Sequence, residues 1–205
     1  MSNILCLSPH TDDVELGMGG TVSRLVREGH KIFYIAFSDA KKSIPEGFPE
    51  DTLIKECTKA SKILNIHHLE ILDFPVREFN GHRQKILDCL LKYKKDIDPK
   101  IVFLPCSSDT HQDHYVVYCE GLRAFKDRTV YGYELPWNNI DFKSRAFFIL
   151  QEEDVKKKEK AFKCYKSQNV RVYYKEHFIK NWIQLRGAQI GKDFAECFEV
   201  IREVN

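Results

Sequence analysis

The residues best suited to chemistry stand in the segment Ser8–Asp13 (SPHTDD), directly after the apolar run Ile4–Leu7. An imidazole and two adjacent carboxylates are unusual at the end of a buried strand, because like charges repel and need a compensating charge. A divalent cation would compensate them. His10 and Asp13, three residues apart in a turn, can converge on one ion, which leaves Asp12 free for another task.

A second cluster follows the apolar run Ile101–Leu104, where the chain continues through PCSSDT into His111–His114 (HQDH). If the two runs are neighbouring parallel strands, both clusters face one crevice at the carboxyl edge of the sheet. Two histidines and one carboxylate, with an open position for water, are typical ligands of a catalytic zinc site. Zinc lowers the pKa of its water to about 7, and Asp12 is the natural base for that water. Fe²⁺, Mn²⁺ and Co²⁺ suit the same ligand types.

Each of these residues also has a purely structural interpretation. Asp12 or Asp13 could cap a helix that starts near Gly20, and His111 or His114 could be surface residues at a helix start. Two acid–histidine clusters at two strand ends favour the chemical interpretation.

Three further segments are better explained by structure than by chemistry. Gly17–Gly20 lacks the G-x-G-x-x-G spacing of a dinucleotide site, so the glycines indicate close packing of the first helix on the sheet. The polar segment Ala40–Pro49 predicts a surface loop that could form one wall of a cleft. The charge run Lys156–Lys160 predicts the solvated face of a helix. No G-x-S-x-G elbow indicates a serine nucleophile.

Short apolar runs alternate with segments of helical periodicity, and this alternation predicts the fold. The expected strands are Ile4–Leu7, Ile32–Phe37, His68–Phe74, Ile101–Leu104, Val130–Leu135 and Phe147–Leu150. The expected helices are Thr21–Glu28, Asp51–Leu64, Arg83–Tyr93, Tyr115–Phe125 and Val155–Tyr165. We therefore expect an α/β fold, with a Rossmann-like, doubly wound, mostly parallel sheet and helices on both faces, in a single domain over residues 1–205.

Composition and charge exclude several classes of protein. The 32 basic and 30 acidic residues give a formal charge of +2, which gives no reason to expect a nucleic-acid partner. No apolar segment is long enough to span a membrane, and the N-terminus shows no basic leader. The seven cysteines form no C-x-x-C pair, which is typical of reduced thiols, so we expect a cytoplasmic protein.

The two clusters resemble the motifs of the PIG-L/LmbE-like family of zinc-dependent N-acetylglucosaminide deacetylases. The family's Pro-His-Pro-Asp-Asp-Val-Glu-x-Gly-x-Gly-Gly-Thr stands here as PHTDDVELGMGGT over Pro9–Thr21, and its His-x-Asp-His as His111–His114. Tyr165–Gln168 resembles the family's Ser-Gln segment, and residues 186–198 resemble its closing Arg-Gly…Gly…Ala-Glu-x-Phe stretch. The resemblance therefore spans nearly the whole chain and implies one LmbE-like domain.

The resemblance also implies a role for each motif residue. The implied zinc ligands are His10, Asp13 and His114, and the implied general base is Asp12. His111 is implied to stabilise the oxyanion, with Asp113 orienting this histidine and helping to keep it charged.

Two positions depart from the family pattern. Thr11 replaces the usual proline between ligand and base, which should leave the turn intact but less rigid. Many relatives have an arginine before a glutamate in the second long helix, where it contacts substrate, whereas this chain reads Leu53–Glu56 (LIKE). The second departure concerns the substrate contacts rather than the reaction.

The sequence thus predicts a zinc-dependent hydrolase that removes the N-acetyl group from an N-acetylated amino sugar or its conjugate. Glu134, Trp137 and Arg186 are the expected substrate contacts, with ordinary packing as the alternative. Two rival functions stay open: a non-catalytic sugar- or metal-binding protein of the same fold, and a metal-dependent hydrolase of another amide or ester. Relatives often assemble, so a homo-oligomer is possible.

Overall fold

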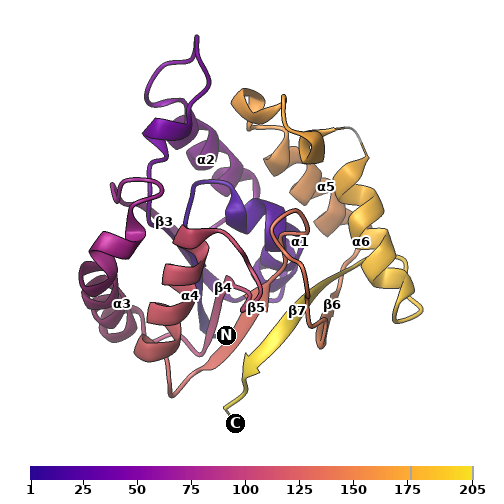
Figure 1. The fold of residues 1–205 in the computed structure, drawn as a ribbon. Coiled ribbons are helices and arrows are strands. Elements are labelled where there is room, and N and C mark those ends of the chain that lie inside the picture. The colour runs from indigo at the N-terminus through magenta and orange to yellow at the C-terminus, as the bar shows by residue number, and fades with distance from the viewer. Residues whose placement is uncertain (176, 205) are drawn as a thin grey trace.

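The computed structural model describes residues 1–175 and 177–204, and its strands form one seven-stranded sheet (Figure 1). The strands are β1 (Asn3–Ser8), β2 (Lys31–Ala36), β3 (His68–Ile71), β4 (Ile101–Pro105), β5 (Thr129–Tyr133), β6 (Ala146–Ile149) and β7 (Ala195–Arg202). Their order is β3-β2-β1-β4-β5-β7-β6, with the first five parallel and β7 antiparallel to both of its neighbours. The predicted mostly parallel, doubly wound sheet is confirmed.

Within the described residues, six α-helices and four short 3-10 helices connect the strands. The α-helices are α1 (Asp13–Arg27), α2 (Thr52–Ile63), α3 (Arg83–Ile97), α4 (Gln112–Ala124), α5 (Glu152–Phe162) and α6 (Phe178–Ala188). The 3-10 helices are η1 (Lys41–Ser43), η2 (Phe79–His82), η3 (Lys166–Gln168) and η4 (Val172–Tyr174). In Figure 1, α3 and α4 lie on one side of the sheet, and α5 and α6 on the other. None of the described helices is long and apolar enough to cross a membrane.

Strand β1 contributes to the hydrophobic cores on both faces of the sheet, because side chains alternate along a strand. Ile4 and Cys6 belong to the core under α1, α2, α5 and α6, whereas Leu5 and Leu7 belong to the core under α3 and α4. All four side chains are fully buried. The strand order places β1, whose end begins the first motif, in the interior of the sheet.

Helix α1 begins at Asp13, so the predicted start at Thr21 is wrong. The glycines argue against a helix by propensity, but the packing of α1 requires them. A Cβ at Gly17 would lie 2.6 Å from Cδ2 of Tyr133, and one at Gly20 would lie 2.5 Å from Cδ1 of Leu150. The predicted close packing of the first helix is therefore confirmed. Strand β7 and helix α6 were absent from the sequence prediction.

Two buried charges complete the hydrogen bonding where α1 is interrupted at Met18 (φ −149°, ψ 18°). A carboxylate oxygen of Glu196 accepts the backbone N–H of Thr21 (2.6 Å), and Nζ of Lys158 donates to the carbonyl of Leu16 (2.6 Å). Lys158 also forms an ion pair with Glu196. The pair therefore caps both sides of the interruption with groups from other elements.

The predicted solvated face of the charge run 156–160 is wrong for one of its members. Lys156 is exposed and pairs with Glu152 one turn earlier, as expected for a solvated face. Lys158 is 0% exposed, with its ammonium 5.0 Å from the centre of the Trp182 ring. Helical position, rather than composition, decides which of these lysines enters the core.

Candidate metal centre

The first motif forms a turn between β1 and α1. The strand ends at Ser8, and Asp12 occupies the position before the first helical residue, Asp13. The backbone N–H of His10 donates to Oδ2 of Asp13 (2.8 Å), which ties the two ends of the turn together. The imidazole of His10 and the carboxylate of Asp13 are thereby held on the same side of the turn.

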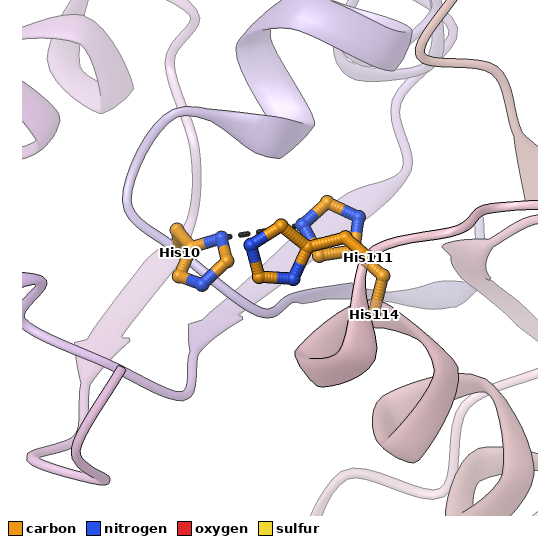
Figure 2. A group of neighbouring side chains, drawn as sticks. All are labelled: His10, His111 and His114. Carbon is orange, nitrogen blue, oxygen red and sulfur yellow. Dashed lines mark hydrogen bonds between the residues drawn. The ribbon is translucent and has the colours of Figure 1, made fainter. Parts of the chain in front are cut away.

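The second motif lies at the end of β4, which pairs in parallel with β1. His111 is the N-cap of α4, and His114 lies in the first turn of that helix. Because the two strands are neighbours, their carboxyl ends bring both motifs to one place. Figure 2 shows the imidazole rings of His10, His111 and His114 gathered in one group.

Three of the predicted ligand atoms form a nearly equilateral triangle. Nδ1 of His10 lies 3.2 Å from Nε2 of His114, the pair joined by the dashed line in Figure 2. Oδ2 of Asp13 lies 3.4 Å from Nδ1 of His10 and 3.5 Å from Nε2 of His114. Ligands of a tetrahedral zinc ion with bonds of 2.0–2.1 Å stand about 3.3–3.4 Å apart. The residues therefore fit a small tetrahedral cation.

Two further aspartates orient the imidazoles of this triangle. Nε2 of His10 lies 3.2 Å from Oδ2 of Asp113, and Nδ1 of His114 lies 2.7 Å from Oδ2 of Asp109. A carboxylate that accepts the proton of one ring nitrogen leaves the other nitrogen free as a ligand. Asp109 was not recognised from the sequence as a partner of His114, although it stands only five residues before that histidine.

The charges around His10 and Asp13 favour a bound cation. Burial would lower the pKa of His10, but hydrogen bonds to Asp113 and Asp13 outweigh it and raise the pKa to about 10. Burial opposes ionisation of Asp13, but the nearby His114 and His10 hold its pKa well below the usual range. The site therefore stabilises positive charge between its carboxylates.

His111 lies beside the triangle, and the structure changes the prediction for its charge. Its ring nitrogens belong to a group, with those of His10 and His114, whose ligand atoms all lie within 4.8 Å of one another. Nδ1 of His111 accepts the backbone N–H of Asp113 (3.2 Å), whereas the Asp113 carboxylate bonds to His10. Burial, and then the neighbouring His114 and His10, lower the pKa of His111 to about 4. The Asp113 carboxylate, which was expected to orient His111, thus contacts His10 instead, and the surroundings of His111 disfavour its charged form.

Asp12 lies next to the triangle and has its own partner. Its Oδ2 accepts the hydroxyl of Tyr174 (3.0 Å), a residue of η4 that was not predicted for the site. Burial, and then the adjacent Asp13 carboxylate, raise the pKa of Asp12. A carboxylate with a raised pKa is a stronger proton acceptor.

A cavity of about 260 Å³ at the carboxyl edge of the sheet is lined by His10, Asp12, Asp13, His111 and His114. Trp137 lines it, as predicted, and stacks on Tyr173 with ring centres 3.8 Å apart and planes 9° from parallel. Ala40 and Ser43 line it as well, so the loop predicted over residues 40–49 does form part of a cleft wall. The stacked rings give the cavity a flat aromatic surface.

Glu134 and Arg186, two predicted substrate contacts, are not among the residues that line this cavity. Glu134 is 4% exposed, and its carboxylate accepts hydrogen bonds from the Arg186 guanidinium and from Nε1 of Trp182 (3.0 Å). These contacts join β5 to α6, so packing is the better explanation for both residues.

The segment Leu53–Glu56, which lacks the arginine of the family pattern, lies at the cavity. Leu53 lines the cavity, and Glu56 binds the backbone N–H (3.0 Å) and the hydroxyl (2.6 Å) of Ser167. Beyond Ser167, Oε1 of Gln168 accepts Nε of Arg171 (2.7 Å), and both of these residues line the cavity. Arg171, which sequence reasoning missed, thus brings a cation to the cavity from a segment tied to α2.

Comparisons with known proteins agree with this site. The family model described as PIG-L, GlcNAc-PI de-N-acetylase, matches residues 5–125. A protein of Escherichia coli (strain K12) described as "Uncharacterized deacetylase YaiS" is 29% identical over 175 residues, which are 80% of this chain and 90% of that protein.

Two solved structures share the fold. N,N'-diacetylchitobiose deacetylase from Pyrococcus horikoshii has a TM-score of 0.82 at 20% identity, over 98% of this chain and 84% of that one. GalB, the 4-carboxy-2-hydroxymuconate hydratase from Pseudomonas putida KT2440, has a TM-score of 0.81 at 19% identity, over 100% and 98% of the two chains. The fold therefore hosts at least two reactions, and the family is decided by the sequence match. Because that match covers more than half of the chain and both motifs, the chain belongs to the PIG-L (GlcNAc-PI de-N-acetylase) family.

Proposed function

We propose that the protein is a zinc-dependent N-deacetylase that releases acetate from an N-acetylated amino sugar or a conjugate of one. The observation that carries the proposal is the triangle of His10 Nδ1, Asp13 Oδ2 and His114 Nε2, with separations of 3.2–3.5 Å, next to the Asp12 carboxylate. Membership of the PIG-L family and the named deacetylases among the similar proteins support it.

The residues of the triangle would hold the metal ion, and zinc suits them best. Two imidazole nitrogens and one carboxylate oxygen, each imidazole oriented by its own aspartate, match the donor set of catalytic zinc sites. Fe²⁺, Mn²⁺ and Co²⁺ accept the same donors, so the metal identity is part of the test below. The chemistry that such an ion supplies is polarisation of the acyl oxygen and a lowered pKa of the attacking water.

Asp12 is the proposed general base. Because Tyr174 donates to Oδ2 of Asp12, Oδ1 is the oxygen available to take a proton from water. The raised pKa of Asp12 lets the same carboxyl group deliver that proton to the nitrogen of the departing amine.

His111 is the proposed hydrogen-bond donor to the oxyanion of the tetrahedral intermediate. Since Nδ1 of His111 accepts the backbone N–H of Asp113, the proton of the neutral ring resides on Nε2. A neutral imidazole with this tautomer donates one hydrogen bond from Nε2 without carrying a charge. A single preorganised donor of this kind contributes about 3 kcal/mol to transition-state stabilisation in comparable sites.

The cavity supports a sugar as the substrate. The stacked pair of Trp137 and Tyr173 offers an aromatic surface, and amino sugars present apolar C–H faces to such surfaces. Asn138, Gln168 and Arg171 add polar groups that hydrogen-bond to hydroxyls. The Pyrococcus enzyme is named for an N-acetylated sugar, which agrees with this class.

Three other aspects of the function stay predictions. We expect one catalytic domain over residues 1–205 and a cytoplasmic location. The cysteines within the described residues are all free, which suits a reducing compartment. A homo-oligomer is possible, as the resemblance implies.

The proposal is tested by metal analysis of the purified protein together with acetate release from a panel of N-acetylated amino sugars. We expect one zinc per chain and acetate release. Asp12→Asn should lower turnover by about 10²–10⁴-fold while the metal stays bound, because only the base is removed. Asp51→Asn, a change of an exposed aspartate that pairs with Lys55, is the matched control and should leave turnover unchanged.

The other outcomes identify the rival functions. Stoichiometric metal without acetate release, but with release from other acylated amines or esters, would assign a different hydrolase. Metal binding and sugar binding without any hydrolysis would assign a binding protein. Since a hydratase shares the fold, the panel should also follow water addition to an unsaturated acid by absorbance. Failure to bind any divalent metal would contradict the proposal entirely.

A further inference from the structure

The turn that carries the metal ligands is held from the protein interior by two tyrosine hydroxyls. We propose that Tyr34 and Tyr165 are positioning residues, whose hydrogen bonds to the backbone carbonyl of Thr11 set the geometry of His10 and Asp13 and thereby the affinity for the metal. This inference rests on the metal site of the proposed function and assigns no group that touches the substrate.

Two hydroxyls from distant parts of the chain meet at one carbonyl oxygen. The hydroxyl of Tyr34 lies 2.9 Å from the oxygen of Thr11, and the hydroxyl of Tyr165 lies 2.5 Å from it. Tyr34 belongs to β2, whereas Tyr165 follows α5. Both side chains are 0% exposed and Thr11 is 1% exposed, so water does not compete for these bonds.

A buried carboxyl group connects the same two hydroxyls to α1. Oε2 of Glu15 lies 3.0 Å from the Tyr34 hydroxyl, and Oε1 lies 2.9 Å from the Tyr165 hydroxyl. Glu15 is itself 0% exposed and stands in the first turn of α1. Each hydroxyl carries one proton, which the Thr11 carbonyl and the facing Glu15 oxygen share, and in this way the two tyrosines join the turn to the helix start in addition to the covalent chain.

The carbonyl of Thr11 is an effective point at which to hold this turn. It shares a rigid peptide plane with the nitrogen of Asp12, so its direction determines how the chain continues toward Asp13. His10 is the residue immediately before it. The proline that the family motif has at this position fixes its own φ angle, which threonine does not. We infer that the two hydroxyls restrict the turn where this chain lacks the ring.

The loss of either hydroxyl should weaken metal binding without unfolding the protein. Removal of groups that orient metal ligands costs about 10–100-fold in metal affinity in comparable sites. We therefore expect Tyr34→Phe and Tyr165→Phe each to raise the Kd for Zn²⁺ by about tenfold. The double variant should lose more than either single variant.

The structure offers a matched control. Tyr133 is also 0% exposed, and its hydroxyl donates to a backbone carbonyl of β1, that of Leu7 (3.1 Å). Tyr133→Phe therefore removes the same kind of buried hydrogen bond from the same strand, but outside the turn. It should leave the Kd for Zn²⁺ unchanged.

The experiment is a Zn²⁺ titration of metal-stripped full-length protein against a chromophoric chelator, for the wild type and the four variants. Thermal unfolding of the same metal-free samples gives a second readout. The inference is supported if the turn variants lose affinity while Tyr133→Phe does not, at equal loss of thermal stability. It is overturned if Tyr34→Phe and Tyr165→Phe bind Zn²⁺ like the wild type, or if Tyr133→Phe loses as much affinity as they do.

The titration separates this inference from the proposed function because it needs no substrate. A wild type that binds Zn²⁺ and releases acetate, with turn variants of unchanged affinity, would reject only the positioning role. A wild type that binds no Zn²⁺ would reject both proposals.

Discussion

Two clusters of buried charge lie beside α1, the metal centre at its start and the Lys158–Glu196 pair at its interruption. In the metal centre, ligand atoms of His10, Asp13 and His114 stand within 3.5 Å of one another and point to one position. In the second cluster, Lys158 and Glu196 pair with each other and with backbone groups of α1.

The difference lies in how each cluster offsets the cost of burial. A buried charge is tolerated when it is paired and hydrogen-bonded, and the Lys158–Glu196 pair meets this condition within the protein. The ligand atoms of the metal centre direct several electron pairs to one position. A cation bound at that position would stabilise the cluster. Buried charges that converge indicate a binding site, whereas buried charges that pair indicate structure.

The largest effect should follow from the loss of a ligand in the converging cluster. His114→Ala removes one corner of the triangle, so we expect metal affinity to fall by more than about 100-fold and hydrolysis to fall to background. Metal analysis and Zn²⁺ titration measure the change. His68→Ala, a change of a half-exposed histidine, should have no effect. If the His114→Ala protein still bound one metal ion per chain, the distinction between converging charges that bind metal and paired charges that stabilise the fold would be contradicted.

The loss of one member of the paired cluster should act on stability instead. Lys158→Met leaves the Glu196 carboxylate buried without its partner, which costs about 3–5 kcal/mol in comparable pairs. For a chain of this size we expect Tm to fall by about 10 °C. Lys156→Met, in the same charge run but exposed, should change the free energy of unfolding by less than about 1 kcal/mol. A calorimetric scan compares the two, and equal shifts would contradict the comparison.

A smaller effect is expected from the group that orients a ligand. Asp109→Asn weakens the contact of 2.7 Å to Nδ1 of His114, so the Kd for metal should rise by about 10–100-fold. The same titration measures it, with the exposed Asp98→Asn as control. If Asp109→Asn lowered Tm as much as Lys158→Met but left the metal affinity intact, Asp109 would belong with the structural charges.

A gradual, pH-dependent effect should come from Glu15, which lies between the two clusters. Burial raises the pKa of Glu15 from its ordinary 4.5 to about 8, so the folded protein holds this proton more tightly than the unfolded chain does. Stability should therefore fall as the pH rises from 4.5 to about 8, by up to about 1.4 kcal/mol per pH unit.

Glu15→Gln removes this titration and should flatten the slope of the unfolding free energy against pH in metal-free protein. Denaturant unfolding at several pH values measures this slope. Glu28→Gln, a change of an exposed residue of the same region, should leave the slope as it is. An unchanged slope in the Glu15→Gln protein would show that another group is responsible for the pH dependence.

The sequence was sufficient for the fold class, the family and the deacetylase activity class, and the comparisons confirm all three. It also predicted ligands at two strand ends, with His10 and Asp13 three residues apart at the first and His114 at the second, and the structure brings their side-chain atoms within 3.5 Å of one another. It did not predict Asp109 as the partner of His114, nor the tyrosines that contact Thr11 and Asp12. Tyr34, Tyr165 and Tyr174 come from separate parts of the chain, and no local spacing connects them to the first motif.

The structure favours packing over substrate contact for Glu134 and Arg186, for a related reason. Their positions near a strand end and in a family-like segment agree with a site, but their side chains meet each other across β5 and α6. The solvated side chain predicted for Lys158 was wrong for the same kind of reason. Lys158 shares its charge run with exposed lysines but forms an ion pair with a buried carboxylate that is distant in the chain.

The sequence by itself determined the two histidine–carboxylate motifs, the alternation of strands and helices as far as α5, and the family, because these depend on local spacing and periodicity. Only the tertiary structure decided which carboxylate orients which imidazole, which tyrosines hold the Thr11 carbonyl, and which charges are internal pairs. Hydrogen bonds and ion pairs act over about 3 Å in space. The fold brings some of these partners together across more than 100 residues, as it does for His10 with Asp113 and for Thr11 with Tyr165, and no local pattern records such contacts.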